Sequence, residues 1–400
     1  MGDIDSLLAA FEAGTLVQPR HEEANIVDLG RAIATLLGAS SVQETPNSLD
    51  IERRIGDADH LVFILLDGVG MNVLDGMPRD AFLPQHVDRE LFTVFPSTTA
   101  VALTSLATGH WPTSHAVTGW WTHLDQVGGP VVILHYVTKA ENRDLAELGV
   151  EPESAFPVPS TLSQFERDAQ VVLPADFVDT TYSRYFSGGR RIVGYSSIED
   201  AVTIVTQRVA EATAPTFTYL YFPHVDTLAH HHGMTRPEVR EALMGIDAAL
   251  ARLHSDLGGK GRIVMTADHG LKDCPVSARH TLRPTRELLP LLRFPPSGDT
   301  RVMYLHVGDG ARERVRRIFQ REFGDRFHLI TVDEADALRL FGPEPLSVET
   351  RNRMGDMVAI SAGTDVLEYH AERGPTPSMM HNCHHSGLTP DEMRVPLAIA

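Results

Sequence analysis

The sequence predicts an α/β fold with a mostly parallel sheet, because apolar segments of strand length alternate with segments of helical periodicity. The segment HLVFILLDG (60–68) is continuously apolar, which is typical of a parallel strand buried on both faces. Four further segments are predicted strands on the same grounds: 130–137, 170–174, 216–222 and 261–267.

Three helices are predicted in the same part of the chain. Segments 28–38 and 237–258 have the amphipathic spacing of helices that bury one face. Segment 99–108 contains neither Gly nor Pro and follows the sequence Pro-Ser-Thr, which commonly begins a helix.

The chain is predicted to divide into a core and an insertion. Residues 1–58 are expected to form a helical segment that packs on the core. The core is expected to span 59–274 and 381–400, and VPLAIA (395–400) has strand character. Between these two parts the pattern predicts a small βαβ unit, with elements at 301–307, 311–324 and 327–338. We therefore predict that 275–380 is an inserted α+β cap subdomain.

The charge of the chain limits its partners. Its 400 residues carry a formal net charge of −18, which argues against a nucleic-acid polymer or an anionic membrane as a partner. A small phosphorylated metabolite or a nucleotide is still compatible with this charge, because bound metal ions reverse the local field.

The cysteines and the apolar runs indicate a cytoplasmic protein. Cys274 and Cys383 are too few for a disulfide framework, and each is expected to be a small buried residue. A single bridge and a soft metal ligand are the alternatives for this pair. The acidic first segment does not have the pattern of a secretory signal, and no apolar run reaches the roughly 18 residues of a membrane span.

Potential metal ligands follow three of the predicted strands: Asp67, Asp226, and the pair Asp268–His269. The carboxyl ends of parallel strands meet at one edge of the sheet, so these side chains are expected to gather there. Asp226 and His230 are separated by one helical turn, which would place both on one face. Each fragment alone also fits a helix cap, a polar turn or a surface run. Together they favour a site for two metal ions.

Hydroxyl groups are concentrated at the predicted start of helix 99–108. Ser97, Thr98 and Thr99 can cap the helix, but a helix N-terminus also stabilises an anion. A hydroxyl beside a metal ion loses its proton more easily and can attack phosphorus. Aspartates, histidines and such a hydroxyl are the groups required for hydrolytic phosphoryl transfer.

The order of these fragments resembles a known family. LVFILLDG (61–68), FPSTTAVALTSLATG (95–109), FPHVDTLAHHHG (222–233), MTADHG (265–270) and HNCHHSGLTP (381–390) are similar to motifs of the alkaline phosphatase superfamily. The resemblance is to its type I phosphodiesterase/nucleotide pyrophosphatase branch and to the phosphonoacetate hydrolase-like relatives. It covers about 60–270 and 381–400, and it implies a three-layer α/β sandwich with two divalent metal ions. Zn²⁺ is expected first, because histidines join the aspartates, and Mn²⁺ second.

The resemblance implies a role for individual residues. The first metal would be held by Asp226, His230 and His385. The second would be held by Asp67, Asp268, His269 and the nucleophile. The family's nucleophilic Thr lies ten residues before the Gly of a Thr-Gly pair, and Thr108-Gly109 then gives Thr99, with Thr98 and Ser97 as alternatives. The roles of His231, His232 and His384 stay open.

One position departs from the family pattern. Trp120 stands where the nucleotide pyrophosphatases have an Asn that helps to hold a phosphate oxygen. Trp120, Trp121 and His123 are expected either to line a substrate pocket or to pack in the core.

The expected activity is hydrolysis of a phosphodiester or nucleotide pyrophosphate through a phospho-threonine on Thr99. The alternatives are a phosphomonoesterase, a phosphonate hydrolase, and a metal-dependent phosphomutase. A catalytically silent binding protein is disfavoured because every expected ligand position is filled. A sulfatase is disfavoured because no Cys or Ser stands in the Cys/Ser-x-Pro-x-Arg context.

Overall fold

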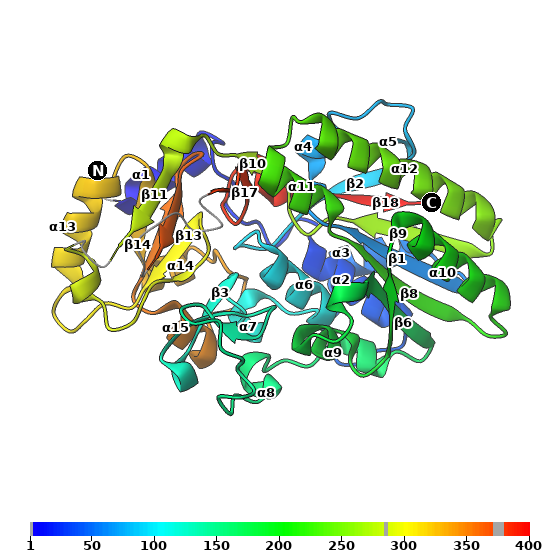
Figure 1. Cartoon of the computed structure of the whole chain (residues 1–400), viewed down its shortest axis with the longest axis horizontal. Helices are drawn as coiled ribbons and strands as arrows, with labels where there is room; N and C mark the ends of the chain where they lie inside the picture. Colours follow the sequence, from blue (N-terminus) through cyan, green and yellow to red (C-terminus); the bar gives the residue numbers. More distant parts are fainter. Residues whose placement is uncertain (1–2, 284–286, 371–379) are drawn as a thin grey trace.

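Two sheets organise the protein, and each forms the centre of one lobe (Figure 1). The computed structural model describes residues 3–283, 287–370 and 380–400. Within these residues no helix combines the length and the apolar character that crossing a membrane requires.

The first sheet is mostly parallel and has the strand order β2-β18-β9-β1-β8-β6-β7. Its strands are β1 (His60–Leu66), β2 (Val87–Phe92), β6 (Asp168–Pro174), β7 (Arg191–Tyr195), β8 (Thr216–Phe222), β9 (Gly261–Thr266) and β18 (Arg394–Ile399). β18 runs antiparallel to both of its neighbours. The predicted strands at 60–68, 170–174, 216–222 and 261–267 are confirmed, and so is the return of 395–400 to this sheet.

Helices cover both faces of the first sheet (Figure 1). One face carries α2 (Ile26–Leu36), α3 (Pro46–Ile55), α6 (Thr99–Thr108) and α9 (Thr181–Ser187), and the other carries α10 (Ile198–Glu211), α11 (His224–His232) and α12 (Pro237–Leu257). In α12 the buried residues Leu243, Ile246, Leu250 and Leu253 recur every three or four positions, so one stripe faces the sheet. The three predicted helices are confirmed.

The second sheet is antiparallel and has the order β14-β15-β13-β12-β3-β4-β5. Its strands are β3 (Trp121–Leu124), β4 (Gly129–Val132), β5 (Val137–Thr138), β12 (Ser297–Gly298), β13 (Val302–Leu305), β14 (Phe327–Thr331) and β15 (Met357–Ser361). Helix α13 (Arg312–Phe323) connects β13 to β14, as the sequence predicts, while β15 pairs between these two strands. The predicted last element at 327–338 is a strand only over Phe327–Thr331, because a capping box at Thr331 begins helix α14 (Val332–Ala337). Segments 121–138 and 297–361 therefore build one sheet, and the division into a core and an inserted cap stays a prediction.

The prediction of one strand at 130–137 is wrong. The segment forms two short antiparallel strands, β4 and β5, joined by a turn in which Tyr136 has a φ of 58°. Ile133 and Tyr136 are buried within this turn, and the Tyr136 hydroxyl donates to the Val150 carbonyl. The apolar run therefore includes a turn with two buried side chains, which hydrophobicity alone does not distinguish from a buried strand.

The remaining elements are short. The helices are α1 (Asp3–Glu12), α4 (Met71–Leu74), α5 (Phe82–His86), α7 (Pro112–His115), α8 (Pro152–Ala155), α14 (Val332–Ala337), α15 (Val348–Met354) and α16 (Pro390–Met393). Two small sheets pair β10 (Lys272–Asp273) with β17 (Cys383–His384) and β11 (Arg279–Leu282) with β16 (Val366–Tyr369). Cys274 and Cys383 are buried free thiols, which confirms the expectation of small buried residues.

Candidate active site

The predicted ligands meet at one edge of the first sheet. β1 lies between β8 and β9, and Leu66 at its end is level with Phe222 of β8. Asp67, helix α11 with Asp226, and the pair Asp268–His269 follow the carboxyl ends of these three adjacent strands. The backbone packs closely at this edge of the sheet. A Cβ atom added to Gly270 would lie 1.9 Å from the Asp391 carbonyl oxygen, so the segment after Asp268–His269 is held tightly against its neighbour.

Asp226, His230 and His385 form the first cluster of potential metal ligands. Asp226 Oδ1 lies 3.3 Å from His230 Nε2 and 3.8 Å from His385 Nε2. Nδ1 of each imidazole donates to a backbone carbonyl, that of Cys383 at 2.7 Å and that of Ser97 at 3.1 Å. Since Nδ1 holds the proton of each neutral ring, both Nε2 atoms present a lone pair to the same point.

Asp67, Asp226 and His269 form the second cluster, and Asp268 adjoins it. His269 Nε2 lies 3.5 Å from Asp67 Oδ1 and 3.4 Å from Asp268 Oδ2. Its Nδ1 donates to the Gly270 carbonyl at 3.0 Å, so in the neutral ring Nε2 is the nitrogen with the lone pair, and it faces the carboxylates.

One oxygen of Asp67 and one of Asp268 are already hydrogen-bonded to protein groups. Tyr221 donates its hydroxyl to Asp67 Oδ2, and Asp268 Oδ1 accepts from the backbone N–H groups of Gly68 and His269, each at 3.1 Å. Three other oxygens are buried and have no hydrogen-bond partner among the described residues: Asp67 Oδ1, Asp226 Oδ1 and Asp268 Oδ2. Burial raises the pKa of Asp67, and the charges of Asp268 and Asp226 raise it further. Buried oxygens left unpaired beside three imidazoles fit divalent cations.

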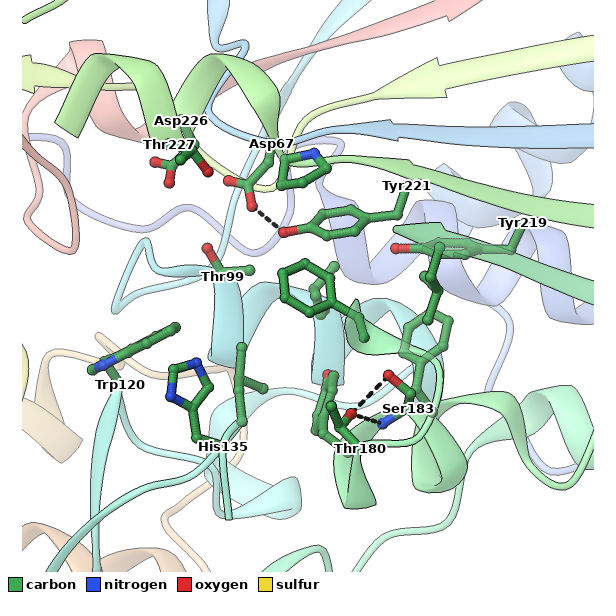
Figure 2. A pocket seen from close by; sticks show the side chains of 17 residues that line it. Asp67, Thr99, Trp120, His135, Thr180, Ser183, Tyr219, Tyr221, Asp226 and Thr227 are labelled. Carbon is green, nitrogen blue, oxygen red and sulfur yellow. Dashed lines mark hydrogen bonds between the residues drawn. The ribbon is translucent and has the colours of Figure 1, made fainter. Parts of the chain in front are cut away.

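Thr99 is the first residue of α6, and its hydroxyl faces the second cluster. Thr99 Oγ1 lies 3.1 Å from His269 Nε2, and Figure 2 shows Thr99 beneath Asp67 and Asp226. The two adjacent hydroxyls point elsewhere: Thr98 donates to Asp299 Oδ2 at 2.9 Å, and Ser97 donates to the Gly387 carbonyl at 2.7 Å.

Two cavities meet at Thr99 and share Trp120, Asp226 and Thr227 in their walls. The first, of about 190 Å³, is lined mainly by aromatic and aliphatic side chains and is called the apolar cavity below. The second, of about 260 Å³, is lined mainly by His, Asp and Thr side chains and is called the polar cavity. A substrate at Thr99 can therefore extend in two chemically different directions.

The three predicted pocket residues differ in position. Trp120 lines both cavities, and Trp121 lines the polar cavity while the Lys139 ammonium lies 3.1 Å from the centre of its ring. His123 lines neither, within the described part of the chain. Its buried ring packs 4.2 Å from that of His306, and its Nε2 lies 3.0 Å from Asp125 Oδ1.

The additional histidines also separate. His231, His381 and His384 line the polar cavity, whereas His232 is exposed and lies outside its wall as described. His384 is buried, and its Nδ1 lies 3.2 Å from the Thr300 hydroxyl.

Some residues of the site are not evident from sequence motifs. Asp299 and Thr300 reach the polar cavity from the turn between β12 and β13, and no local pattern marks them. Tyr221 does carry a signal, because Tyr219 and Tyr221 alternate along β8 and must face the same side of the sheet.

Comparison with known proteins gives a family and a fold for the chain. Residues 61–386 match the family profile described as type I phosphodiesterase / nucleotide pyrophosphatase. No curated protein sequence matches the chain.

Solved structures share the fold. Murine ectonucleotide pyrophosphatase/phosphodiesterase 5 superimposes with a TM-score of 0.62 at 14% identity, covering 84% of this chain and 87% of the other. Its inactive variant in complex with AMP gives a TM-score of 0.61 at 14% identity, with the same coverage of 84% and 87%. Phosphonoacetate hydrolase from Sinorhizobium meliloti 1021, in complex with phosphonoformate, gives 0.60 at 18% identity, covering 84% and 89%. The predicted alkaline phosphatase-like sandwich with a mostly parallel sheet is confirmed.

Proposed function

The chain belongs to the type I phosphodiesterase/nucleotide pyrophosphatase family, and from this we propose that it is a two-metal hydrolase of phosphodiesters or nucleotide pyrophosphates with Thr99 as nucleophile. The observation that carries the proposal is the group of unpaired buried oxygens beside the Thr99 hydroxyl. A protein rarely buries such atoms without a partner, and cations would provide one.

The two clusters define the proposed metal sites. Asp226, His230 and His385 would hold one ion, and Asp67, Asp268, His269 and Thr99 the other. Zn²⁺ suits a donor set of three imidazoles and three carboxylates, and Mn²⁺ is the second choice. Bound there, the cations would lower the pKa of the hydroxyl and offset the charge that develops on the phosphoryl group.

The reaction proceeds in two displacements. Thr99 Oγ1 attacks phosphorus as its proton passes to solvent, a new P–O bond forms, and the bond to the leaving oxygen breaks. The leaving alkoxide takes a proton from water. A water molecule then attacks the phospho-threonine, the bond to Thr99 breaks, and Thr99 regains a proton. Two inversions give net retention at phosphorus.

The position of Thr99 supports its role in this reaction. It begins α6, so the unpaired N–H groups of the first turn and the helix dipole favour negative charge beside it. The hydroxyls of Thr98 and Ser97 donate to Asp299 and to the Gly387 carbonyl, so neither faces the second cluster as Thr99 does.

The test compares p-nitrophenyl phosphate, bis-p-nitrophenyl phosphate and a nucleotide p-nitrophenyl ester, with Zn²⁺ or Mn²⁺ restored after chelation. Preference for the two diesters supports the proposal. Preference for the monoester contradicts it in favour of a phosphomonoesterase. Failure to cleave any of the three with two metals bound contradicts it in favour of phosphonate or phosphomutase substrates, which phosphorus NMR of the products separates.

A further inference from the structure

The apolar cavity opens directly beside the proposed nucleophile. Thr99, Asp67 and Asp226 form its inner end, and hydrocarbon and aromatic side chains form most of the remaining wall. Figure 2 shows this arrangement, with Trp120 and His135 on the side opposite Tyr221. A group attached to phosphorus at Thr99 can therefore extend into an apolar space.

Part of the polar lining of this wall is already hydrogen-bonded within the protein. Tyr221 donates to Asp67, and Thr180 donates to the Ser183 hydroxyl at 2.8 Å while it accepts the Ser183 N–H at 3.0 Å (Figure 2). The Tyr182 hydroxyl lies 3.2 Å from that of Thr104, which already donates to a carbonyl, so Tyr182 is the donor. Along this wall a nucleobase, whose edge has several donors and acceptors, would have only the polar groups of four side chains to replace its water, those of Trp120, His135, Tyr219 and Thr227.

The wall also has no counter-charge for an anion. Neither Lys nor Arg lines the cavity in the described residues, and the carboxylates Asp67 and Asp226 stand at its inner end. Burial raises the pKa of Tyr182 and Tyr219, so their hydroxyls stay uncharged. A second phosphate or a carboxylate would be buried in this space without a partner, which is strongly unfavourable.

The size of the cavity matches one ring. An engineered apolar cavity of about 150 Å³ accommodates benzene, and this cavity measures about 190 Å³. The polar cavity on the other side of Trp120 has hydrogen-bonding groups for the second substituent, including Asp299, Thr300 and His384.

We propose that the apolar cavity binds an uncharged aryl group, or a hydrocarbon group of that size, so that the preferred substrates are phosphodiesters with one such substituent. This inference rests on the proposed function, because it assumes that phosphorus is bound at Thr99. It places nucleotides among the poorer ligands of the cavity.

Binding to the metal-loaded wild-type protein tests the inference separately from turnover. Phenylphosphonate, methylphosphonate, 4-carboxyphenylphosphonate and AMP are titrated calorimetrically, since each of the three phosphonates has only one organic group to place. Phenylphosphonate should bind about tenfold or more tightly than methylphosphonate, because its ring leaves water. It should also bind more tightly than the other two ligands. Equal affinities for phenylphosphonate and methylphosphonate, or tighter binding of AMP, would overturn the inference.

A charge placed at the wall sharpens the test. Phe177 lines the cavity and is 38% exposed, so Phe177→Lys should fold and add a cation there. The advantage of phenylphosphonate over methylphosphonate should fall to about threefold or less, and 4-carboxyphenylphosphonate should bind about fivefold or more tightly than it binds wild type. Leu49 on α3 is 40% exposed, and Leu49→Lys is the matched control that should change neither affinity. Unchanged discrimination in folded Phe177→Lys would overturn the inference.

Turnover of bis-p-nitrophenyl phosphate by the same preparation distinguishes the two proposals. Hydrolysis without a preference for phenylphosphonate contradicts the aryl inference alone. Tight phenylphosphonate binding without hydrolysis of any ester contradicts the proposed function and leaves the aryl group assigned to the cavity.

Discussion

The two ligand clusters share Asp226 but differ in charge. In the first, Asp226 faces two imidazoles. Burial works against its ionisation, but His230 and His385 outweigh it and hold the pKa of Asp226 below its ordinary value. Burial likewise opposes charge on His230, and Asp226 outweighs it and raises the pKa of His230. Without a metal, the Asp226 carboxylate and a protonated His230 can form an ion pair in this cluster.

The second cluster has no such internal compensation. Three carboxylates surround a single imidazole, that of His269: they are Asp67, Asp226 and Asp268. Burial and the charges of the other two carboxylates raise the pKa of Asp67. Such a cluster requires either a proton or a cation. Neighbouring ligand sets of similar composition can therefore depend on metal to very different degrees. We expect the second cluster to bind its ion more tightly and to lose more stability when it is empty.

The largest expected effect is that of Thr99→Ala, which removes the hydroxyl that faces the second cluster. Turnover of bis-p-nitrophenyl phosphate should fall by about 10⁴-fold or more, as for other covalent nucleophiles. Metal content and melting temperature should stay close to those of wild type. Thr98→Ala is the adjacent control and should retain most of the activity, because Thr98 is bonded to Asp299. Full activity in Thr99→Ala would move the nucleophile to Thr98 or Ser97.

His385→Ala tests whether the first cluster can lose its metal alone. Its Nε2 is one of three ligand atoms, so affinity for one ion should fall by more than the roughly 100-fold seen when outer-shell partners are removed. Elemental analysis after dialysis against a weak chelator should then give one metal per chain instead of two. Unchanged stoichiometry would assign the ligand to His384 or His381. Loss of both ions would contradict the expectation that the two clusters bind their ions independently.

Asp67→Asn tests the charge imbalance of the second cluster in metal-free protein. The folded state keeps a proton on Asp67 at pH values where the unfolded state has lost it, because burial and the neighbouring carboxylates raise its pKa. The folded state then binds more protons, so wild-type stability should fall as pH rises above the ordinary Asp range, by up to about 1.4 kcal/mol per pH unit.

In Asp67→Asn this slope should be smaller, and the variant should gain less from added metal than wild type. Urea denaturation at pH 5, 6.5 and 8 with a strong chelator measures how the free energy of unfolding changes with pH in each protein. Equal slopes in the two proteins would show that Asp67 is not the source of the instability.

The sequence predicts most of the first sheet and its ligands for a local reason. Asp67 and the Asp268–His269 pair directly follow apolar strands, so strand and ligand lie in one short segment. Parallel pairing of β1 with β8 and β9 then brings segments that lie far apart in sequence to one edge.

The wall contributed by the second sheet has no comparable signal. β12 is two residues long, and Gly298 pairs with Trp121, although the two are distant in sequence. Asp299 and Thr300 reach the site through this pairing, which hydrophobic periodicity does not reveal. For the same reason the placement of His123 away from the cavities depends on its contact with His306, which comes from beyond β13.

Tyr221→Phe gives the smallest expected effect and tests how the second cluster is oriented. The Tyr221 hydroxyl donates to Asp67 Oδ2, which directs Oδ1 toward His269. Loss of this outer-shell donor should weaken the second ion by about tenfold and leave the first unchanged. Tyr195→Phe is the matched control, because the buried Tyr195 hydroxyl donates to the Tyr221 carbonyl at 2.8 Å and does not bond to a ligand. Competition with a fluorescent chelator measures both affinities. If both variants lower the affinity for the second ion equally, a general loosening of β8 explains the loss. A loss of affinity in Tyr221→Phe alone means that the second cluster depends on the hydrogen bond to Asp67 as well as on its charge.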